Sequence, residues 1–159
     1  MKLRIAQKIL DGWAKALRRA RRREIGGVLF GEHVGEADFR IVEATTQARG
    51  GNDVAFQRKA GKARRDLKSL ARRHGDDPER FNYLGEWHSH PNAPAAPSRV
   101  DEITMYQLLA DPGTNVNFLV LLINRLNDQG ALELSAVAYL ASGHKIPCDI
   151  VVESCEKAS

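Results

Sequence analysis

Two short stretches, Gly-Glu-Trp-His-Ser-His-Pro at residues 85–91 and Ser-Arg-Val-Asp at residues 98–101, form the most specific pattern in the sequence. The first is typical of a strand end, where alternate side chains share a face, so His88 and His90 point the same way. The second begins a predicted helix, and the proline-rich loop between them can bring Asp101 back to the histidines. Two imidazole nitrogens and one carboxylate are a usual ligand set for catalytic zinc, with the fourth position left for water. The pattern therefore predicts a zinc site.

Each part of this pattern also has a simpler interpretation. A His-x-His pair occurs by chance on surface strands, and Ser98 followed by Asp101 is typical of a helix N-cap with an acid in the first turn. The cap and the metal site are compatible, because a helix N-terminus is a rigid place to hold a ligand carboxylate. The combined pattern is far more specific than its parts.

The rest of the sequence alternates helices and strands early and pairs strands late. This order predicts an α/β fold, a three-layer-like sandwich with a mixed β-sheet, as a single domain over residues 1–159. Apolar residues at helical spacing and runs of helix formers predict helices over residues 4–21, 57–74 and 98–110. Apolar runs predict strands over residues 26–31, 39–47, 81–88, 117–125, 131–140 and 146–152, and residues 50–53 read as a turn.

Composition fits an ordinary globular protein. The chain has 159 residues, of which 43% are hydrophobic and 28% charged. No stretch has the roughly 20 apolar residues that a membrane span needs, and the basic start lacks the apolar core of a signal peptide. Cys148 and Cys155 have neither a zinc spacing nor enough partners for a disulfide framework, so we expect free thiols and a cytoplasmic protein.

Positive charge is concentrated in the first half of the chain. Residues 1–75 carry 19 Lys and Arg against 8 Asp and Glu, with one cluster at residues 18–23 and another at residues 59–73. Such clusters can be solvated helix faces, or they can hold phosphates or an acidic partner. No aromatic residue within them offers a stacking platform, and no nucleic-acid-binding motif is present, so we do not expect nucleic acid as a partner.

The motif residues together resemble a known family. Glu24 stands two residues before Gly-Gly-Val-Leu-Phe-Gly at residues 26–31, and seven residues separate His90 from Ser98. This arrangement resembles the JAMM motif of the JAB1/MPN/Mov34 zinc metalloprotease family, and the resemblance extends from Glu24 to the last predicted hairpin.

The resemblance implies a cytidine-deaminase-like fold and an enzyme that cleaves peptide or isopeptide bonds after the C-terminus of ubiquitin-like proteins. It implies that His88, His90 and Asp101 hold Zn²⁺, that Glu24 is the general acid and base, and that Ser98 helps to hold the oxyanion.

The Gly-Glu-Trp sequence at residues 85–87 differs from eukaryotic members and resembles short bacterial JAB proteins. Some of those belong to antiphage operons of the CBASS type, where they remove a conjugated nucleotidyltransferase. Glu86 alternates with His88 along the strand, so it is a candidate for orienting a metal ligand, or it is simply a buried acid.

Other functions fit the sequence less well. A zinc deaminase needs Pro-Cys-x-x-Cys, and the second cysteine is missing after Pro147-Cys148. A non-catalytic MPN scaffold typically lacks one or more motif residues, whereas this chain keeps all five. The expected partner is a protein with a C-terminal tail, recognised by loops such as residues 48–57 and 91–97, and a sulfur-carrier role stays open beside a defence role.

Overall fold

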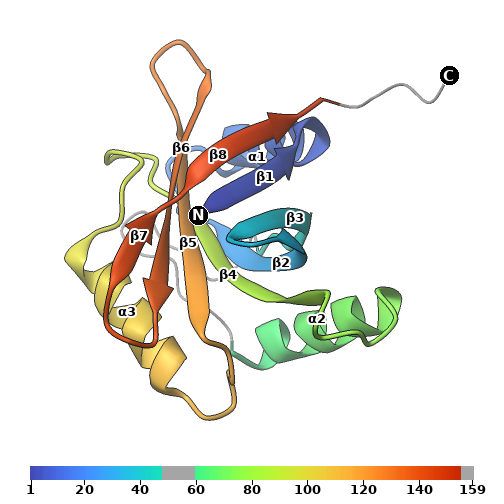
Figure 1. Ribbon diagram of the computed structural model, residues 1–159. Coiled ribbons are helices and arrows are strands. Elements are labelled where there is room, and N and C mark those ends of the chain that lie inside the picture. The colour runs from blue at the N-terminus through green and yellow to red at the C-terminus, as the bar shows by residue number, and fades with distance from the viewer. Residues whose placement is uncertain (48–59, 155–159) are drawn as a thin grey trace, which may run out of the picture.

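The computed structural model describes residues 1–47 and 60–154, and every structural statement below concerns these residues. Within them the chain forms eight strands and three helices (Figure 1). The helices are α1 (Gln7–Ala20), α2 (Ala60–Arg73) and α3 (Arg99–Ala110). The strands are β1 (Lys2–Ala6), β2 (Gly26–Gly35), β3 (Asp38–Ala44), β4 (Phe81–Ser89), β5 (Phe118–Leu126), β6 (Leu132–Leu140), β7 (Lys145–Pro147) and β8 (Asp149–Glu153).

All eight strands belong to one mixed sheet with the order β7-β6-β5-β4-β2-β3-β1-β8. β4 pairs parallel with β5, and β1 pairs parallel with both β3 and β8, while the other neighbours are antiparallel. The prediction of an α/β fold with a mixed sheet is therefore confirmed.

The two edge strands are consecutive in the chain and meet at Cys148. The Cys148 N–H donates to the Ala136 carbonyl at 2.9 Å, and the Asp149 N–H donates to the Met1 carbonyl at 2.9 Å. The sheet thus curls until one continuous segment serves both edges (Figure 1). Cys148 is a free thiol, and burial raises its pKa to about 11, so it stays protonated at neutral pH. Cys155 lies outside the described residues.

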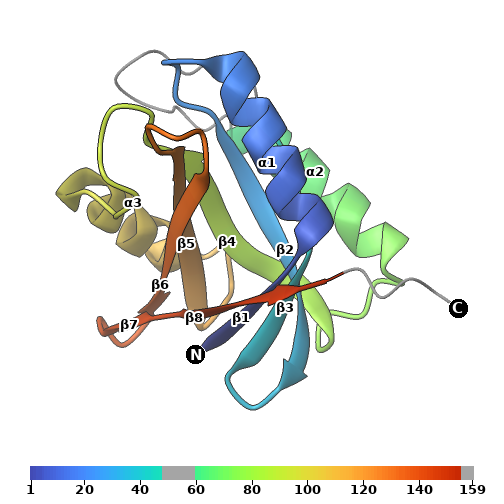
Figure 2. The same cartoon turned by 90° about the horizontal axis from the view of Figure 1, so that it is seen from above.

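Helices cover both faces of the sheet. On one face, Trp13 of α1 packs into the cluster that includes Leu29 and Trp87. On the other face, α2 buries Leu70 and α3 buries Met105 in two further clusters. Figure 1 shows α1 above the central strands and α2 and α3 below them, and Figure 2 looks down onto the α1 side. None of these helices has the length and hydropathy of a membrane span.

The predicted helix over residues 4–21 is wrong at its start. Residues 2–6 form β1, and the helix begins only at Gln7. Leu3 and Ile5 are both fully buried, which is the alternation of a strand, and β1 is held by parallel partners on both sides. Ile5 also stands at helical spacing from Ile9, so the apolar pattern alone fits either element.

The other predicted elements are present, with shifted ends. The strand predicted at residues 26–31 extends to Gly35, and the one predicted at residues 146–152 is divided into β7 and β8. The turn at residues 50–53 and the start of the helix predicted from residue 57 lie outside the described residues.

Gly85 provides a test of this packing. Its φ is +149°, and a Cβ at this position would lie 1.9 Å from the Val120 carbonyl oxygen of β5. We expect Gly85→Ala to lower the free energy of unfolding by about 2–4 kcal/mol in urea melts. Gly143→Ala is the matched control, because Gly143 also has positive φ but has open space around it. An equal loss in both variants would show that the contact with β5 contributes nothing.

Candidate metal centre

Backbone pairing fixes the two histidines at the end of β4. His88 lies in the sheet between Gly26 of β2 and Ile123 of β5. The His90 N–H donates to the Asn124 carbonyl at 2.9 Å, so attachment to β5 continues past the last residue of β4. Both imidazoles are therefore held by a buried, doubly paired strand, which is a rigid support for a site.

The start of α3 supplies the carboxylate. Ser98 is the N-cap: its Oγ accepts the Asp101 N–H at 3.2 Å, and its own N–H donates to Asp101 Oδ2 at 2.7 Å. This reciprocal capping box confirms the N-cap predicted for Ser98. It also fixes the Asp101 side chain, because the same carboxylate that closes the box faces the histidines.

The three predicted ligands come together. His88 Nε2 and His90 Nε2 lie 3.0 Å apart, and Asp101 oxygens lie 3.1 Å from His88 Nε2 and 3.5 Å from His90 Nε2. Tetrahedral zinc with bonds of about 2.0–2.2 Å needs donor atoms roughly 3.3–3.5 Å apart. The spacing therefore fits one metal ion with little movement, and the three residues could hold it.

Local electrostatics favour a cation at this position. Burial alone would raise the pKa of Asp101, but hydrogen bonds from His88, His90 and Ser98 outweigh it and hold the pKa well below its usual range. The hydrogen bond to Asp101 raises the pKa of His90, and the nearby charge of Glu24 adds to this effect. The site thus keeps an ionised carboxylate in a largely buried setting, where charge interactions are strong.

A contact that the sequence did not reveal orients His90. Its Nδ1 lies 3.1 Å from the Pro94 carbonyl oxygen. When Nδ1 carries the proton and donates it to that carbonyl, Nε2 is unprotonated, and its lone pair faces Asp101 and His88. Arg125 in turn donates to the Ala93 carbonyl at 3.2 Å, which ties the proline-rich loop to β5. Backbone carbonyls of this kind leave no mark in a side-chain motif.

Glu24 lies beside the site although it is far away in sequence. Its neighbour Ile25 exchanges two hydrogen bonds with Ser89: the Ser89 N–H donates to the Ile25 carbonyl at 2.8 Å, and the Ile25 N–H donates to Ser89 Oγ at 3.0 Å. This pairing places residue 24 next to His90, in agreement with the effect of the Glu24 charge on His90. The strand register therefore puts residue 24 across from His90, and the role of Glu24 stays a prediction.

The two other candidates occupy different positions. Ser98 is exposed at the mouth of the site, and accepting the Asp101 N–H leaves its hydroxyl hydrogen available for donation. Glu86 is buried, on the same face of β4 as His88, and accepts a hydrogen bond from the Tyr83 hydroxyl at 3.1 Å.

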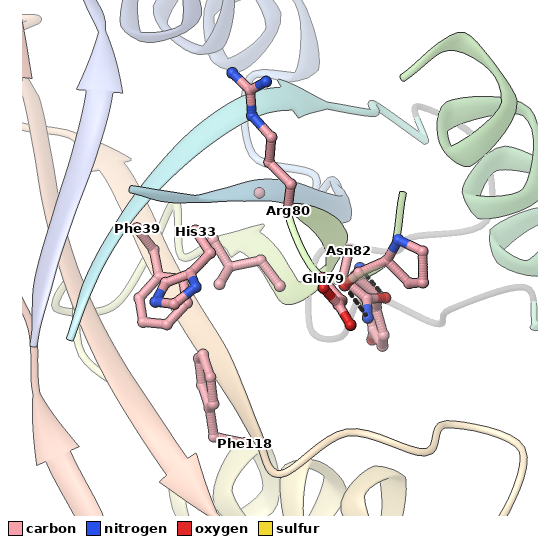
Figure 3. A pocket seen from close by; sticks show the side chains of 10 residues that line it. His33, Phe39, Glu79, Arg80, Asn82 and Phe118 are labelled. Atoms are coloured by element: carbon pink, nitrogen blue, oxygen red, sulfur yellow. Dashed lines mark hydrogen bonds between the residues drawn. The ribbon is translucent and has the colours of Figure 1, made fainter. Parts of the chain in front are cut away.

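A hollow of about 210 Å³ lies at the end of the sheet opposite the metal centre (Figure 3). His33 stacks on Phe39, and Phe118 packs against Phe39 with ring centroids 5.0 Å apart. Arg80 points away from this hollow and pairs with Glu32 at 2.8 Å. Among the described residues, the group of potential metal ligands is at the other end, with His88. The hollow in Figure 3 is therefore separate from the metal centre and shares no residue with it.

Comparison with known proteins agrees with this geometry. The sequence profile described as "Prokaryotic homologs of the JAB domain" matches residues 6–137. The chain belongs to this prokaryotic JAB-domain family. The family includes metalloproteases, and the resemblance drawn from Glu24 and the His-Ser-His-Pro motif is confirmed.

Solved structures show the same fold. The solution structure of protein DSY2949 from Desulfitobacterium hafniense is 20% identical, with a TM-score of 0.65 over 96% of this chain and 93% of that one. The solution structure of a protein from Salinibacter ruber is 23% identical, with a TM-score of 0.54 over 100% of this chain and 95% of that one. No curated protein matches the chain.

Metal analysis tests the assignment of the JAB-domain site. We expect the purified protein to bind one zinc ion, and a protein with both His88→Ala and His90→Ala to lose it, because one carboxylate alone holds zinc weakly. His144→Ala is the control, since His144 is exposed and lies outside the cluster. Elemental analysis after dialysis gives the result, and full zinc content in the double variant would refute the assignment.

Proposed function

We propose that this JAB-domain protein is a zinc-dependent peptidase or isopeptidase of the JAMM type. The observation that carries the proposal is the cluster of His88, His90 and Asp101, whose nitrogen and oxygen atoms are spaced to hold one ion. The position of Glu24 beside His90 supports it, because hydrolysis also needs a carboxylate near the attacking water.

Different residues of the chain carry out metal binding, proton transfer and stabilisation of the oxyanion. His88, His90 and Asp101 would hold a zinc ion, which would lower the pKa of a bound water molecule to about 7 and polarise a carbonyl group. Glu24 takes a proton from the attacking water and later gives it to the leaving amine, which is worth roughly 100- to 10,000-fold in rate. The Ser98 hydroxyl donates to the oxygen on which negative charge develops.

The proposed substrate is a protein joined through its C-terminal tail to another group. A glycine at the end of the tail lets the scissile carbonyl approach the site closely, because it has no Cβ. Within this class, the tail belongs to a ubiquitin-like protein or to a nucleotidyltransferase conjugated in CBASS-type defence, and processing of a sulfur-carrier protein is the alternative. The free Cys148 suits a reducing cytoplasm as the place of action.

A fluorogenic fusion tests the activity. We expect the wild-type protein to release a fluorophore linked after a ubiquitin-like tail that ends in glycine, and to act far more slowly when this glycine is changed to valine. Glu24→Gln should keep the fold and the zinc but lose about 100- to 10,000-fold in turnover. Glu79→Gln is the control, since Glu79 is exposed at the opposite end of the sheet.

Two results would refute parts of this proposal. A wild-type rate in Glu24→Gln would exclude Glu24 as the acid and base. A zinc-loaded protein that cleaves no C-terminal fusion would favour the non-catalytic scaffold, which binds such partners without cutting them.

Ser98→Ala separates two roles of one hydroxyl. Loss of the cap should lower the free energy of unfolding by about 1 kcal/mol in thermal or urea melts. Loss of the donor should lower kcat and leave zinc content unchanged, because the hydroxyl stabilises charge that develops only in the transition state. A rate loss that vanishes after correction for the unfolded fraction would leave Ser98 with the cap alone.

A further inference from the structure

Among the described residues, one edge of β3 is unpaired over the last part of the strand. β1 pairs with β3 only as far as Ile5 opposite Ile41, because the chain turns into α1 at Gln7. Beyond Ile41, no strand among the described residues pairs with this edge over residues 42–46. The Thr45 N–H donates to the Val28 carbonyl of β2. Because backbone amides alternate in direction along a strand, the N–H groups of Ala44 and Thr46 point away from β2.

This edge lines a groove of about 540 Å³, which we call the β3-edge groove. Val42 and Ala44 of β3 and Thr46 just beyond it line the groove, the first two turns of α1 form one wall, and His74 stands on the other side. The volume is within the range of about 300–1,000 Å³ typical of ligand sites. A strand edge that lies between helices can be reached by a single extended chain.

Two residues of α1 point to an occupant. Gly12 lies inside the helix, where glycine costs about 1 kcal/mol relative to alanine. A Cβ at Gly12 would meet nothing within 4 Å, so packing within the described structure does not require the glycine. Beside it, Trp13 is 2% exposed, and its indole N–H has no hydrogen-bond partner. Buried donors nearly always have a partner, so the unpaired indole N–H is an unexplained feature of a residue that lines the groove.

We propose that the β3-edge groove binds an extended peptide segment of the protein substrate as an added strand. Main-chain hydrogen bonds to the edge at residues 42–46 would give affinity, as in other strand-addition complexes, and the glycine at position 12 leaves room for the bound backbone. A second copy of this chain is a poorer occupant, because its sheet would have to enter between α1 and His74. The proposal rests on the proposed function for the identity of the peptide as substrate.

The strand pairing gives the distance between the groove and the metal centre. Gln47, Gly26 and His88 form one row across β2, because Gly26 pairs with both of the others. Strands lie about 4.8 Å apart, so a strand added beyond β3 would be roughly 14 Å from His88. At about 3.3 Å per residue, at least four extended residues separate the bound segment from the scissile bond.

The test uses the full chain with Glu24→Gln to prevent cleavage. A displayed library of random linear peptides is selected on this protein, and the enriched peptides are synthesised with a fluorophore for anisotropy. Adding Gly12→Leu, which fills the groove wall, should weaken their binding at least about ten-fold. Lys15→Leu is the matched control, since Lys15 is exposed on the same helix and does not line the groove.

Strand addition has a further signature. N-methylation of the peptide at successive residues should weaken binding at every second position, because only alternate amides of a strand face its neighbour. Gly12→Ala adds a single Cβ into open space and should give a smaller loss in the same direction.

Equal affinity in Gly12→Leu and Lys15→Leu, or no enriched peptide, would overturn the inference. A concentration-dependent dimer that Gly12→Leu dissociates in sedimentation would also overturn it, because a second copy would then fill the groove. A protein with His88→Ala should bind the peptides unchanged, so a failure of the metal chemistry is distinguishable from a failure of the groove.

Discussion

The narrow passage of β2 between its two neighbours is the constraint on which the site depends. A Cβ at Gly26 would lie 2.4 Å from the Trp87 carbonyl oxygen, and one at Gly27 would lie 1.9 Å from the Thr45 carbonyl oxygen. Only a residue without a side chain fits at either position. Because β2 can run this close to β4, the residues just before β2 pair with the end of β4, and residue 24 lies across from His90. The glycine pair thus determines how near residue 24 comes to His90.

Asp101 combines a structural and a chemical role without conflict. Its Oδ2 accepts the Ser98 N–H in the capping box, while its Oδ1 lies 3.1 Å from His88 Nε2. A carboxylate has more lone pairs than the cap uses, so the side chain can be oriented by the helix start and still offer an electron pair to a metal. A free surface aspartate would lose rotamer freedom on binding an ion, whereas this one has already lost it on folding.

Much of this arrangement could be predicted from the sequence, because side-chain motifs carry it. The ligand set of His88, His90 and Asp101 follows from strand alternation and helix capping, both of which are local. The Pro94 carbonyl could not be found, since any residue supplies a carbonyl and only the loop's path aims it at His90. β1 is not predictable for a related reason: a short strand is recognised by its partners, and those of Ile5 are distant in sequence.

The two ends of the sheet differ in a way that explains where chemistry is possible. At the end near Phe118, aromatic rings pack on one another and the nearby Arg80 is bound to Glu32, so polar groups there are already satisfied. At the other end, β4 and α3 meet through His88, His90 and Asp101, which contact one another while the Pro94 carbonyl and the Ser98 N–H hold His90 and Asp101 in place. A buried cluster of two imidazoles and a carboxylate is costly without a cation to share. Binding an ion would offset that cost, so a metal held by these three residues would stabilise the fold.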